Sequence, residues 1–197
     1  MNATAHPKHA ASPHPVLAPI LQRWSPRAFD QDRPVTETEM LTLLDAARWA
    51  PSANNLQPWR LAWGLRGEPG FAAILGCLNP GNAGWAGRAG ALLIGCTVLA
   101  RPDGTPSRHA AHDLGQALAI MAVQGAAMGL GVHQMGGFNV EAARIALAVP
   151  AGTEPYTAVA IGWPGDAGHL SEAHAAQEAA PRSRHPLSHI APRGGWR

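Results

Sequence analysis

Two pairs of arginines lie near opposite ends of the sequence, and each pair has a spacing suited to one anionic group. Arg23, Ser25 and Arg27 alternate in a segment that a proline keeps extended, because proline disfavours helix at the residue before it. Residues two apart in an extended segment point to the same side, so two guanidinium groups and a hydroxyl can face one ligand. Arg182 and Arg184, two residues apart, would share a side of an extended segment in the same way. The alternative is that each pair is simply solvated, and the pattern alone leaves both interpretations open.

A proline-bracketed run of small and polar residues, 50–59, joins an amphipathic segment to a β-prone one. Ala50 precedes a proline, so the helix before it is expected to end there. Asn54 and Asn55 are turn formers whose side chains compete with backbone pairing. Taken alone, the run is typical of a helix-to-strand connection without chemistry. Its place between the two arginine pairs makes it a candidate wall of a binding site.

A glycine pair, Gly136–Gly137, follows a short β-prone segment and adds a third feature. Arginines suit a phosphate, a small-residue loop lets the backbone approach a flat ring, and amides suit the carbonyl and nitrogen edges of such a ring. Flavin mononucleotide (FMN) combines these groups. The three features together therefore favour FMN over a metal ion or a nucleic acid.

Several other chemistries lack the residues they need. The sequence holds no Gly-x-Ser-x-Gly nucleophile elbow, and the glycines of 125–131 lie at a helix end rather than in a phosphate-binding turn before a helix. His109 and His112 lack further ligands at metal-binding spacing, so with Asp113 they are better explained as a cluster at a helix start. Lys8 is the only lysine and the arginines are scattered, which argues against a nucleic-acid surface.

The elements that must position these residues alternate between helix and strand. Thr36 and Glu39 form a capping-box pattern before an apolar repeat of helical spacing, which predicts a helix up to about Trp49. The residues after 163 are polar and contain several prolines, which predicts an irregular tail. The remaining patterns predict helices over 16–23, 67–77, 113–128 and 139–147, strands over 57–65, 91–99, 132–138 and 154–162, and a loop over 79–90 with at most one helical turn.

The helix expected over 113–128 has little polar face, which implies burial nearly all round. A second apolar surface must then cover it. Either a second copy of the chain supplies that surface at a dimer interface, or the helix is enclosed within one chain. Gly129 supplies the left-handed turn that ends it.

Length and composition indicate one domain with an ordinary core: 197 residues, 46% hydrophobic and 14% charged. We expect residues 1–15 to form a flexible leader and 16–197 the domain. Residues 1–15 lack the apolar core of a signal peptide, and the longest apolar run, 89–100, is too short to span a membrane. Cys77 and Cys96 form neither a disulfide framework nor a metal motif, which predicts a reduced, cytoplasmic protein.

The order of these motifs resembles that of the FMN-dependent nitroreductase family. The resemblance covers roughly 17–196, and its specific part is Pro-Ser-x-x-Asn-x-Gln-Pro-Trp at 51–59. It implies an α+β fold with a central, mostly antiparallel sheet flanked by helices, assembled as an intertwined homodimer. The C-terminal tail would wrap the partner and complete its sheet, with two FMN sites at the subunit interface.

The resemblance also implies roles for individual residues. Arg23, Ser25 and Arg27 would contact the phosphate, the ribityl chain and the pyrimidine edge of the flavin, and Arg182 and Arg184 would hold the phosphate. The other implied contacts are Pro51, Ser52, Ala53 and Asn55 from the second subunit, Met135, Gly136 and Gly137 beside flavin N5, and Asn82 at the pyrimidine edge.

The sequence departs from the family pattern at two places. Gly136 stands where many members have an acidic residue, which puts in doubt any water held near N5. Some members place a lysine near N1 and O2 in the region of Trp85, so Arg88 or Arg27 would have to supply the positive charge here. The chain is also short for the family, so the helices that cover the substrate pocket would be reduced.

The resemblance implies an NAD(P)H oxidoreductase in which flavin N5 carries the chemistry and no catalytic side chain or metal is needed. NADH or NADPH would deliver hydride and leave, and an electron-poor acceptor such as a nitroaromatic or a quinone would follow in ping-pong order. The expected partners are a second copy of the chain and a small-molecule acceptor, without nucleic acid or membrane. The alternatives are a flavin-binding protein with little turnover and a specialised flavin enzyme, such as a dehalogenase or one that consumes its flavin.

Overall fold

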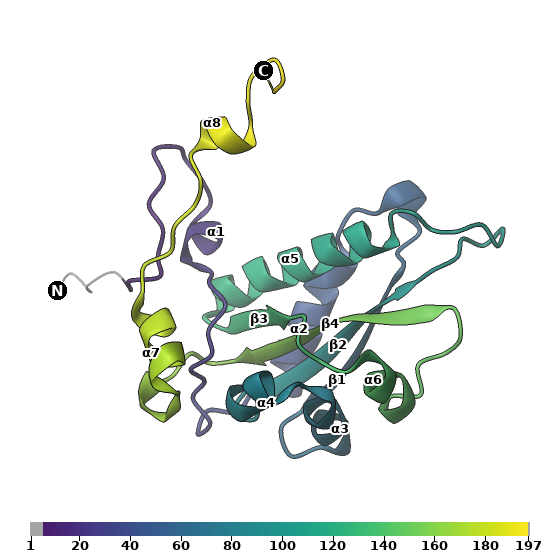
Figure 1. The fold of residues 1–197 in the computed structure, drawn as a ribbon, viewed down its shortest axis with the longest axis horizontal. Helices are drawn as coiled ribbons and strands as arrows, with labels where there is room; N and C mark the ends of the chain where they lie inside the picture. Colours follow the sequence, from purple (N-terminus) through teal and green to yellow (C-terminus); the bar gives the residue numbers. More distant parts are fainter. Residues whose placement is uncertain (1–5, 197) are drawn as a thin grey trace.

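A four-stranded antiparallel sheet lies between two layers of helices (Figure 1). The computed structural model describes residues 6–196. The strands are β1 (Trp59–Leu65), β2 (Ala91–Val98), β3 (Gly131–Met135) and β4 (Thr153–Gly162), in the order β1-β2-β4-β3. The helices are α1 (Ala18–Gln22), α2 (Glu37–Arg48), α3 (Pro69–Cys77), α4 (Pro80–Ala86), α5 (Ala110–Met128), α6 (Val140–Ala146), α7 (Glu172–Ala179) and α8 (Leu187–Ile190), with 3-10 turns η1 (Ala53–Asn55) and η2 (Ala167–His169). The predicted α+β class with an antiparallel sheet is confirmed.

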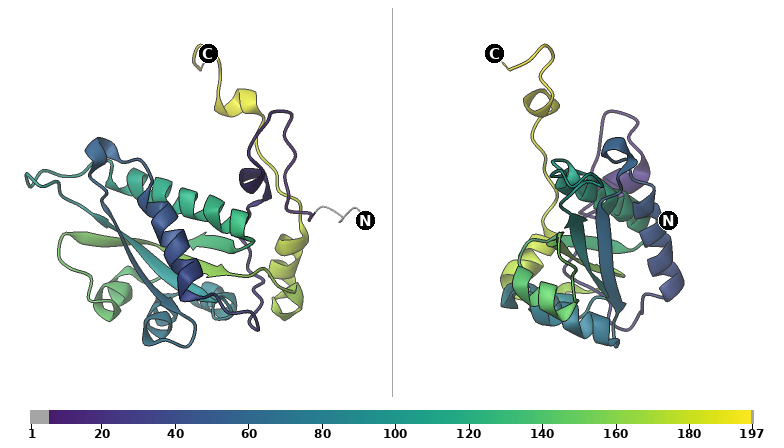
Figure 2. Two further views of the ribbon diagram at one scale, coloured as in Figure 1. Left: turned by 180° about the vertical axis from the view of Figure 1, so that it is seen from behind. Right: turned by 90° about the vertical axis from the view of Figure 1, so that its right-hand side faces the viewer.

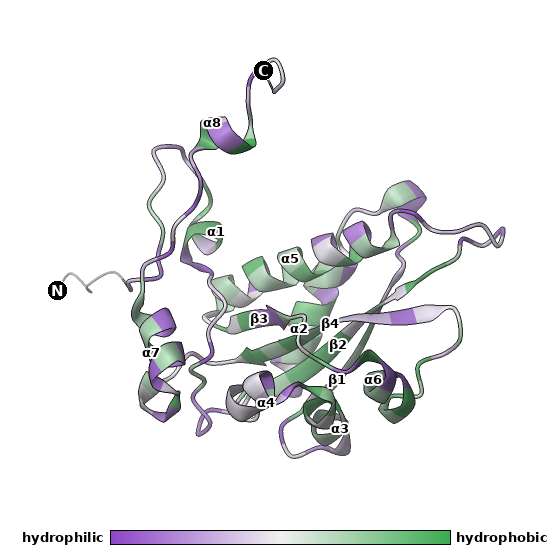
Figure 3. Cartoon of the chain, viewed as in Figure 1, coloured by the Kyte–Doolittle hydropathy of each residue, from purple (hydrophilic) through white to green (hydrophobic). Residues whose placement is uncertain are grey.

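Both faces of the two inner strands are buried. Alternate residues of a strand point to opposite faces, so Leu93 of β2 packs under α2 and α5, whereas Leu92 and Ile94 pack against α3, α4 and α6. Strand β4 divides in the same way, with Val159 on the first face and Ala158 on the second. Figure 2 shows the helices on the two faces, and Figure 3 shows β2 as almost uniformly hydrophobic. This double burial explains the long apolar run over 89–100.

Local sequence signals place most element boundaries. The Thr36 hydroxyl accepts from the Glu39 amide, and the Glu39 carboxylate accepts from the Thr36 amide, which confirms the capping box. The Asn139 side chain caps α6, and Gly129 ends α5 with a positive φ of 83°. The loop expected over 79–90 instead contains α4, which begins with Pro80 at a position where a proline fits a helix.

The C-terminal segment is not wholly irregular, because it contains α7 and α8. Ser171 begins α7 by accepting a hydrogen bond from the amide of His174. Beyond α7 the chain runs away from the sheet and carries α8 (Figure 1). Leu187, Ile190 and Trp196 in this tail are exposed.

In this single chain α5 is not buried all round. Leu114, Leu118 and Met121 face the core, while Gly115 and Ala119 are exposed. Within residues 6–196, none of the helices combines the length and the apolar character needed to cross a bilayer.

We predict that Gly131→Ala destabilises the fold by about 1–3 kcal/mol, because overpacking at a rigid contact cannot be relieved cheaply. A Cβ at Gly131 would lie 2.2 Å from Cγ of Pro26. Gly76→Ala in α3 is the matched control, since Gly76 is exposed, a Cβ there meets nothing within 4 Å, and alanine favours a helix over glycine by up to about 1 kcal/mol. In urea unfolding, Gly131→Ala should therefore have a lower midpoint than the unsubstituted protein, and Gly76→Ala an equal or higher one. Equal stability of the two variants would contradict the close contact.

Candidate functional site

Helix α7 brings the second arginine pair, Arg182 and Arg184, to Arg23 of the first pair. The chain leaves α7 at Ala180, and Arg182 then donates from its two terminal nitrogens to the backbone carbonyls of Leu21 and Arg23. Arg23 in turn donates to the Ser25 hydroxyl over 3.4 Å. Residues at opposite ends of the sequence therefore form one surface.

Arg23, Arg182 and Arg184, which we call the arginine cluster, lie close enough to affect one another electrostatically. Burial lowers the pKa of Arg23, and Arg184 lowers it further. Burial also lowers the pKa of Arg182, and Arg23 and Arg184 add to the shift. Within residues 6–196 none of the three forms a salt bridge with a carboxylate. Like charges held together without a counterion destabilise the fold unless an anion joins them.

The arginine cluster borders a cavity of about 500 Å³. Arg23 also lines two smaller cavities, of about 280 Å³ and about 190 Å³. The smallest cavity runs between α5 and β3 and is lined by Arg23, Ser25, Ala119, Ala122, Val123, Val132 and Gln134. The space beside the arginines thus continues along a wall of small and apolar side chains.

Hydrogen bonds from two elements fix the segment 23–27. The Glu178 carboxylate of α7 accepts from Nε1 of Trp24 and from the amide of Arg27, both over 3.0 Å. Nδ1 of the buried His133 on β3 donates to the Pro26 carbonyl over 2.8 Å. Burial lowers the pKa of His133, which favours the neutral imidazole. The segment is therefore held between α7 and β3.

Arg27 points away from the arginine cluster and toward α4. Its guanidinium carbon lies 5.9 Å from the centre of the Trp85 ring, and Trp85 packs against His133 at 4.6 Å between ring centres. Arg88 instead lines a separate cavity with Asp30, Asp32 and Asp166. Of the two arginines considered as positive groups near Trp85, Arg27 is the one that contacts its ring.

The glycine pair lies next to Asn82. Nδ2 of Asn82 donates to the Gly137 carbonyl over 3.0 Å, and a Cβ on Gly137 would lie 2.5 Å from the same nitrogen. A Cβ on Gly136 would meet nothing within 4 Å. Met135 is buried, and its carbonyl accepts from the Thr157 hydroxyl. These contacts leave open space beside Gly136 at the end of β3.

The loop 51–57 lies at the opposite end of α5. Its Ala53 amide donates to the buried carboxylate of Asp113 over 3.0 Å, at the first turn of that helix. Asn54, Asn55 and Gln57 all have positive φ. Asparagine tolerates this conformation, so the strain lies mainly at Gln57. Strain of this kind clusters at functional sites, so it supports a role for the loop beyond connection.

One chain does not bring this loop to the arginine cluster. The cavities beside Arg23 use Ala119 to Gly129 of α5, whereas the loop is attached at Asp113. Gln116 also donates to the Pro51 carbonyl over 3.5 Å. At 1.5 Å per helical residue, Asp113 lies roughly 9 Å along the axis from Ala119 and roughly 20 Å from Ala126. None of the three cavities beside Arg23 is lined by residues 51–55. The structure therefore divides the expected site residues into two groups: Pro51, Ser52, Ala53 and Asn55 at the start of α5, and Arg23, Ser25, Arg27, Asn82, Met135, Gly136, Gly137, Arg182 and Arg184 around β3 and α7.

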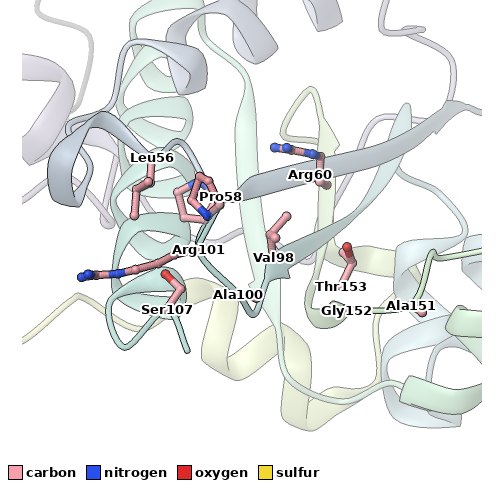
Figure 4. Close-up of a pocket in the computed structure, with 11 residues that line it drawn as sticks. Leu56, Pro58, Arg60, Val98, Ala100, Arg101, Ser107, Ala151, Gly152 and Thr153 are labelled. Atoms are coloured by element: carbon pink, nitrogen blue, oxygen red, sulfur yellow. The ribbon is translucent and has the colours of Figure 1, made fainter. Parts of the chain in front are cut away.

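A further cavity of about 440 Å³ adjoins the loop but lies apart from the arginine cluster (Figure 4). Arg60 and Arg101 line it, and Figure 4 shows that their guanidinium groups do not converge. Arg60 also donates to the Gln57 and Trp59 carbonyls. This cavity contains none of the side chains expected to hold a phosphate.

Asp113 and Glu178 position the two halves of the site, and sequence reasoning did not identify either role. Asp113 and its partner Ala53 are 60 residues apart, and Glu178 and Arg27 are 151 apart. Spacing in the sequence carries no signal for such pairs. Ser171 followed by an alanine-rich run could have revealed α7 itself.

Comparison with known proteins identifies the family. The model of the nitroreductase family matches residues 20–66. A crystal structure described as an oxidoreductase containing FMN is 33% identical, with a TM-score of 0.90 over the whole of this chain and 99% of its own. The chain belongs to the nitroreductase family. It is an oxidoreductase by that assignment, and its antiparallel sheet with flanking helices is the fold of the similar structures.

Two other matches extend the comparison of this nitroreductase-family chain. A Desulfovibrio desulfuricans protein, classed as a nitroreductase and solved with FMN, is 23% identical with a TM-score of 0.73, over 94% of this chain and all of that one. An uncharacterised 15.4 kDa protein of Mycolicibacterium smegmatis is 36% identical over 64% of this chain and 84% of its own length. The first likeness concerns the fold, and the second indicates a relative of similar sequence.

We predict that Glu178→Ala lowers the free energy of unfolding by about 2 kcal/mol, because two donors to a partly buried carboxylate lose their acceptor. Glu172→Ala is the control on the same helix, where an exposed carboxylate is worth less than about 1 kcal/mol. Denaturant unfolding of both variants gives the comparison. Similar stability of the two variants would show that Glu178 does not hold the segment 23–27.

Proposed function

We propose that this chain binds FMN, with the phosphate at the arginine cluster. The observation that carries the proposal is the convergence of three arginines that lack a carboxylate partner within residues 6–196. Nε of Arg23 and of Arg182 is buried there without an acceptor. A phosphate monoester offers nearly two negative charges and three acceptor oxygens, which match this set of donors. The FMN in two similar structures supports the same assignment.

The flavin ring would lie along α5 and β3, with its N5 edge near Gly136. The cavity that Arg23 and Ser25 share with Ala119 and Val132 leads in that direction. The open space beside Gly136 leaves room for a ring edge. Asn82 and Met135 flank that position, and Arg27 would supply positive charge at the pyrimidine edge.

A second copy of the chain would complete the site. Within one chain the loop 51–55 lines none of the cavities beside Arg23, so Pro51, Ser52, Ala53 and Asn55 would approach the ring from the other subunit. Gly115 and Ala119 leave an exposed face of small residues on α5, which permits a close approach by another backbone. The exposed Leu187 and Ile190 of the tail would be covered by the same partner. We therefore propose a homodimer.

The proposed reaction transfers hydride equivalents from NADH or NADPH to an electron-poor small molecule, such as a quinone or a nitroaromatic, in ping-pong order. Bound FMN would supply hydride acceptance and donation at N5, so no side-chain nucleophile is required. The arginine cluster holds the phosphate and thereby fixes the position of the ring. The Arg27 guanidinium favours negative charge at the pyrimidine edge. Gly136 leaves the ring face open to the donor and then to the acceptor.

A flavin-binding protein with little turnover is the second candidate. The observation that favours it is Gly136, which offers no side chain to hold a water or a proton beside N5. A specialised enzyme of the same fold, a dehalogenase or one that consumes its flavin, would differ in the acceptor rather than in the binding site.

We also propose a cytoplasmic location. Cys77 and Cys96 are both free and buried, and burial raises the pKa of Cys96 to about 11. Unreactive free thiols of this kind suit a reducing compartment.

We predict that the purified protein is yellow, and that anaerobic mixing with NADH or NADPH bleaches the flavin absorption because the open ring face admits the donor. Subsequent addition of a quinone should restore the absorption, as ping-pong order requires. Retained flavin that neither coenzyme bleaches would favour the binding protein. A colourless protein that stays colourless after incubation with FMN would contradict the proposed function.

A further inference from the structure

The start of the described chain packs against the arginine cluster. His6 stacks on Trp24 with 4.4 Å between ring centres, and a turn follows in which the His9 amide donates to the His6 carbonyl over 2.8 Å. The Ala10 amide then donates to the carbonyl of Leu21, which also accepts from Arg182. The segment 6–11 therefore lies on the residues that carry Arg23 and receive Arg182.

Lys8 attaches this segment to α7. Its ammonium group donates to the carbonyl of Gln177, and the residue is 9% exposed. A helix would normally pair that carbonyl with the amide four residues later, but this residue is Pro181, which has no amide hydrogen. Lys8 thus satisfies an acceptor that the helix leaves free. The contact lies next to the turn that delivers Arg182 and Arg184.

The segment also forms part of the cavity wall. Pro7, His9, Ala10 and Ala11 line the cavity of about 500 Å³ opposite Arg182 and Arg184. His9 lines the neighbouring cavity of about 280 Å³ as well, together with Arg23. An imidazole can donate a hydrogen bond to an anion in either its neutral or its charged form. The segment 6–11 therefore places one more donor where an anionic group meets the arginines.

We propose that the segment 6–11 is a wall of the phosphate site, with His9 contacting the phosphate and Lys8 holding the segment in place. This inference rests on the proposed binding of FMN. Lys8 anchors the segment and His9 contacts the phosphate, so bound phosphate and the docked segment 6–11 stabilise each other. The docked segment raises the affinity for an anion that bridges His9 and the arginine cluster. By thermodynamic linkage, the same anion lowers the open fraction of the segment by the same factor.

Lys8 makes this coupling directly measurable, because it is the only lysine in the chain. The full-length protein, stripped of flavin, is treated with an amine-acetylating reagent, and acetylation of Lys8 is followed by mass spectrometry of the peptide that contains it. We expect slow labelling, because Lys8 is buried and hydrogen-bonded. Saturating FMN should slow it further by about three- to tenfold, which corresponds to the free energy of one hydrogen bond. Inorganic phosphate at high concentration should protect Lys8 as well.

FMN affinity in substituted proteins provides the second measurement. His9→Ala should weaken FMN binding by about three- to tenfold, through the loss of that hydrogen bond. His14→Ala is the matched control, because His14 is exposed and lines neither cavity. Lys8→Met, which keeps the side-chain length but removes the donor, should weaken FMN binding similarly. Circular dichroism and thermal unfolding check that the variants are folded.

The outcomes separate this inference from the proposed function. If the unsubstituted protein binds FMN, yet Lys8 labelling does not slow and His9→Ala binds as His14→Ala does, the leader is not part of the site and the FMN assignment stands. If the protein binds no FMN, the proposed function fails. Protection of Lys8 by inorganic phosphate would then still support an anion site walled by the leader, and its absence would overturn the inference.

Discussion

The repulsion among Arg23, Arg182 and Arg184 is the constraint on which the rest of the site depends. Burial and proximity lower the pKa of Arg23 and of Arg182, so the fold keeps charges together that would separate if they were free. Such an arrangement persists only where other contacts determine it. An anion bound at the arginine cluster would replace this repulsion with attraction, since Arg23 and Arg184 would gain charge-assisted hydrogen bonds and Arg182 an opposite charge nearby.

Helix α7 supplies most of those contacts. The Glu178 carboxylate accepts hydrogen bonds from Trp24 and Arg27 in the segment 23–27. Lys8 donates to the Gln177 carbonyl in the last turn of the same helix, just before the chain reaches Arg182. His133 and the close approach of Gly131 to Pro26 hold this segment from the sheet side. This short helix at the edge of the fold thereby connects the segment 6–11, the segment 23–27 and the chain that carries Arg182 and Arg184. The segment 23–27 also contacts His133 and Trp85, which lie near the ring position proposed beside Gly136.

Local signals in the sequence predicted the helices and strands of the body, because capping residues and apolar periodicity act within a few residues. The Thr36–Glu39 box, the Asn139 cap and the Gly129 turn all formed as expected. The motif order also indicated the family. Long-range contacts could not be predicted from such local signals. For example, nothing in the sequence pairs Lys8 with Gln177, which is 169 residues away. The prolines on either side of α7 argue against regular structure, so this helix was not predicted in the polar tail.

Comparison of FMN with riboflavin tests the central claim most directly, because the two ligands differ only in the phosphate. Equilibrium titration of the flavin-free protein, followed by flavin fluorescence, should show FMN binding at least about 100-fold more tightly, the worth of two charge-assisted contacts. Arg184→Ala, which removes one of these contacts, should reduce the preference to about tenfold, and Arg193→Ala, at an exposed position in the same tail, should keep it. Equal affinity of the unsubstituted protein for FMN and riboflavin would contradict a phosphate site at the arginine cluster.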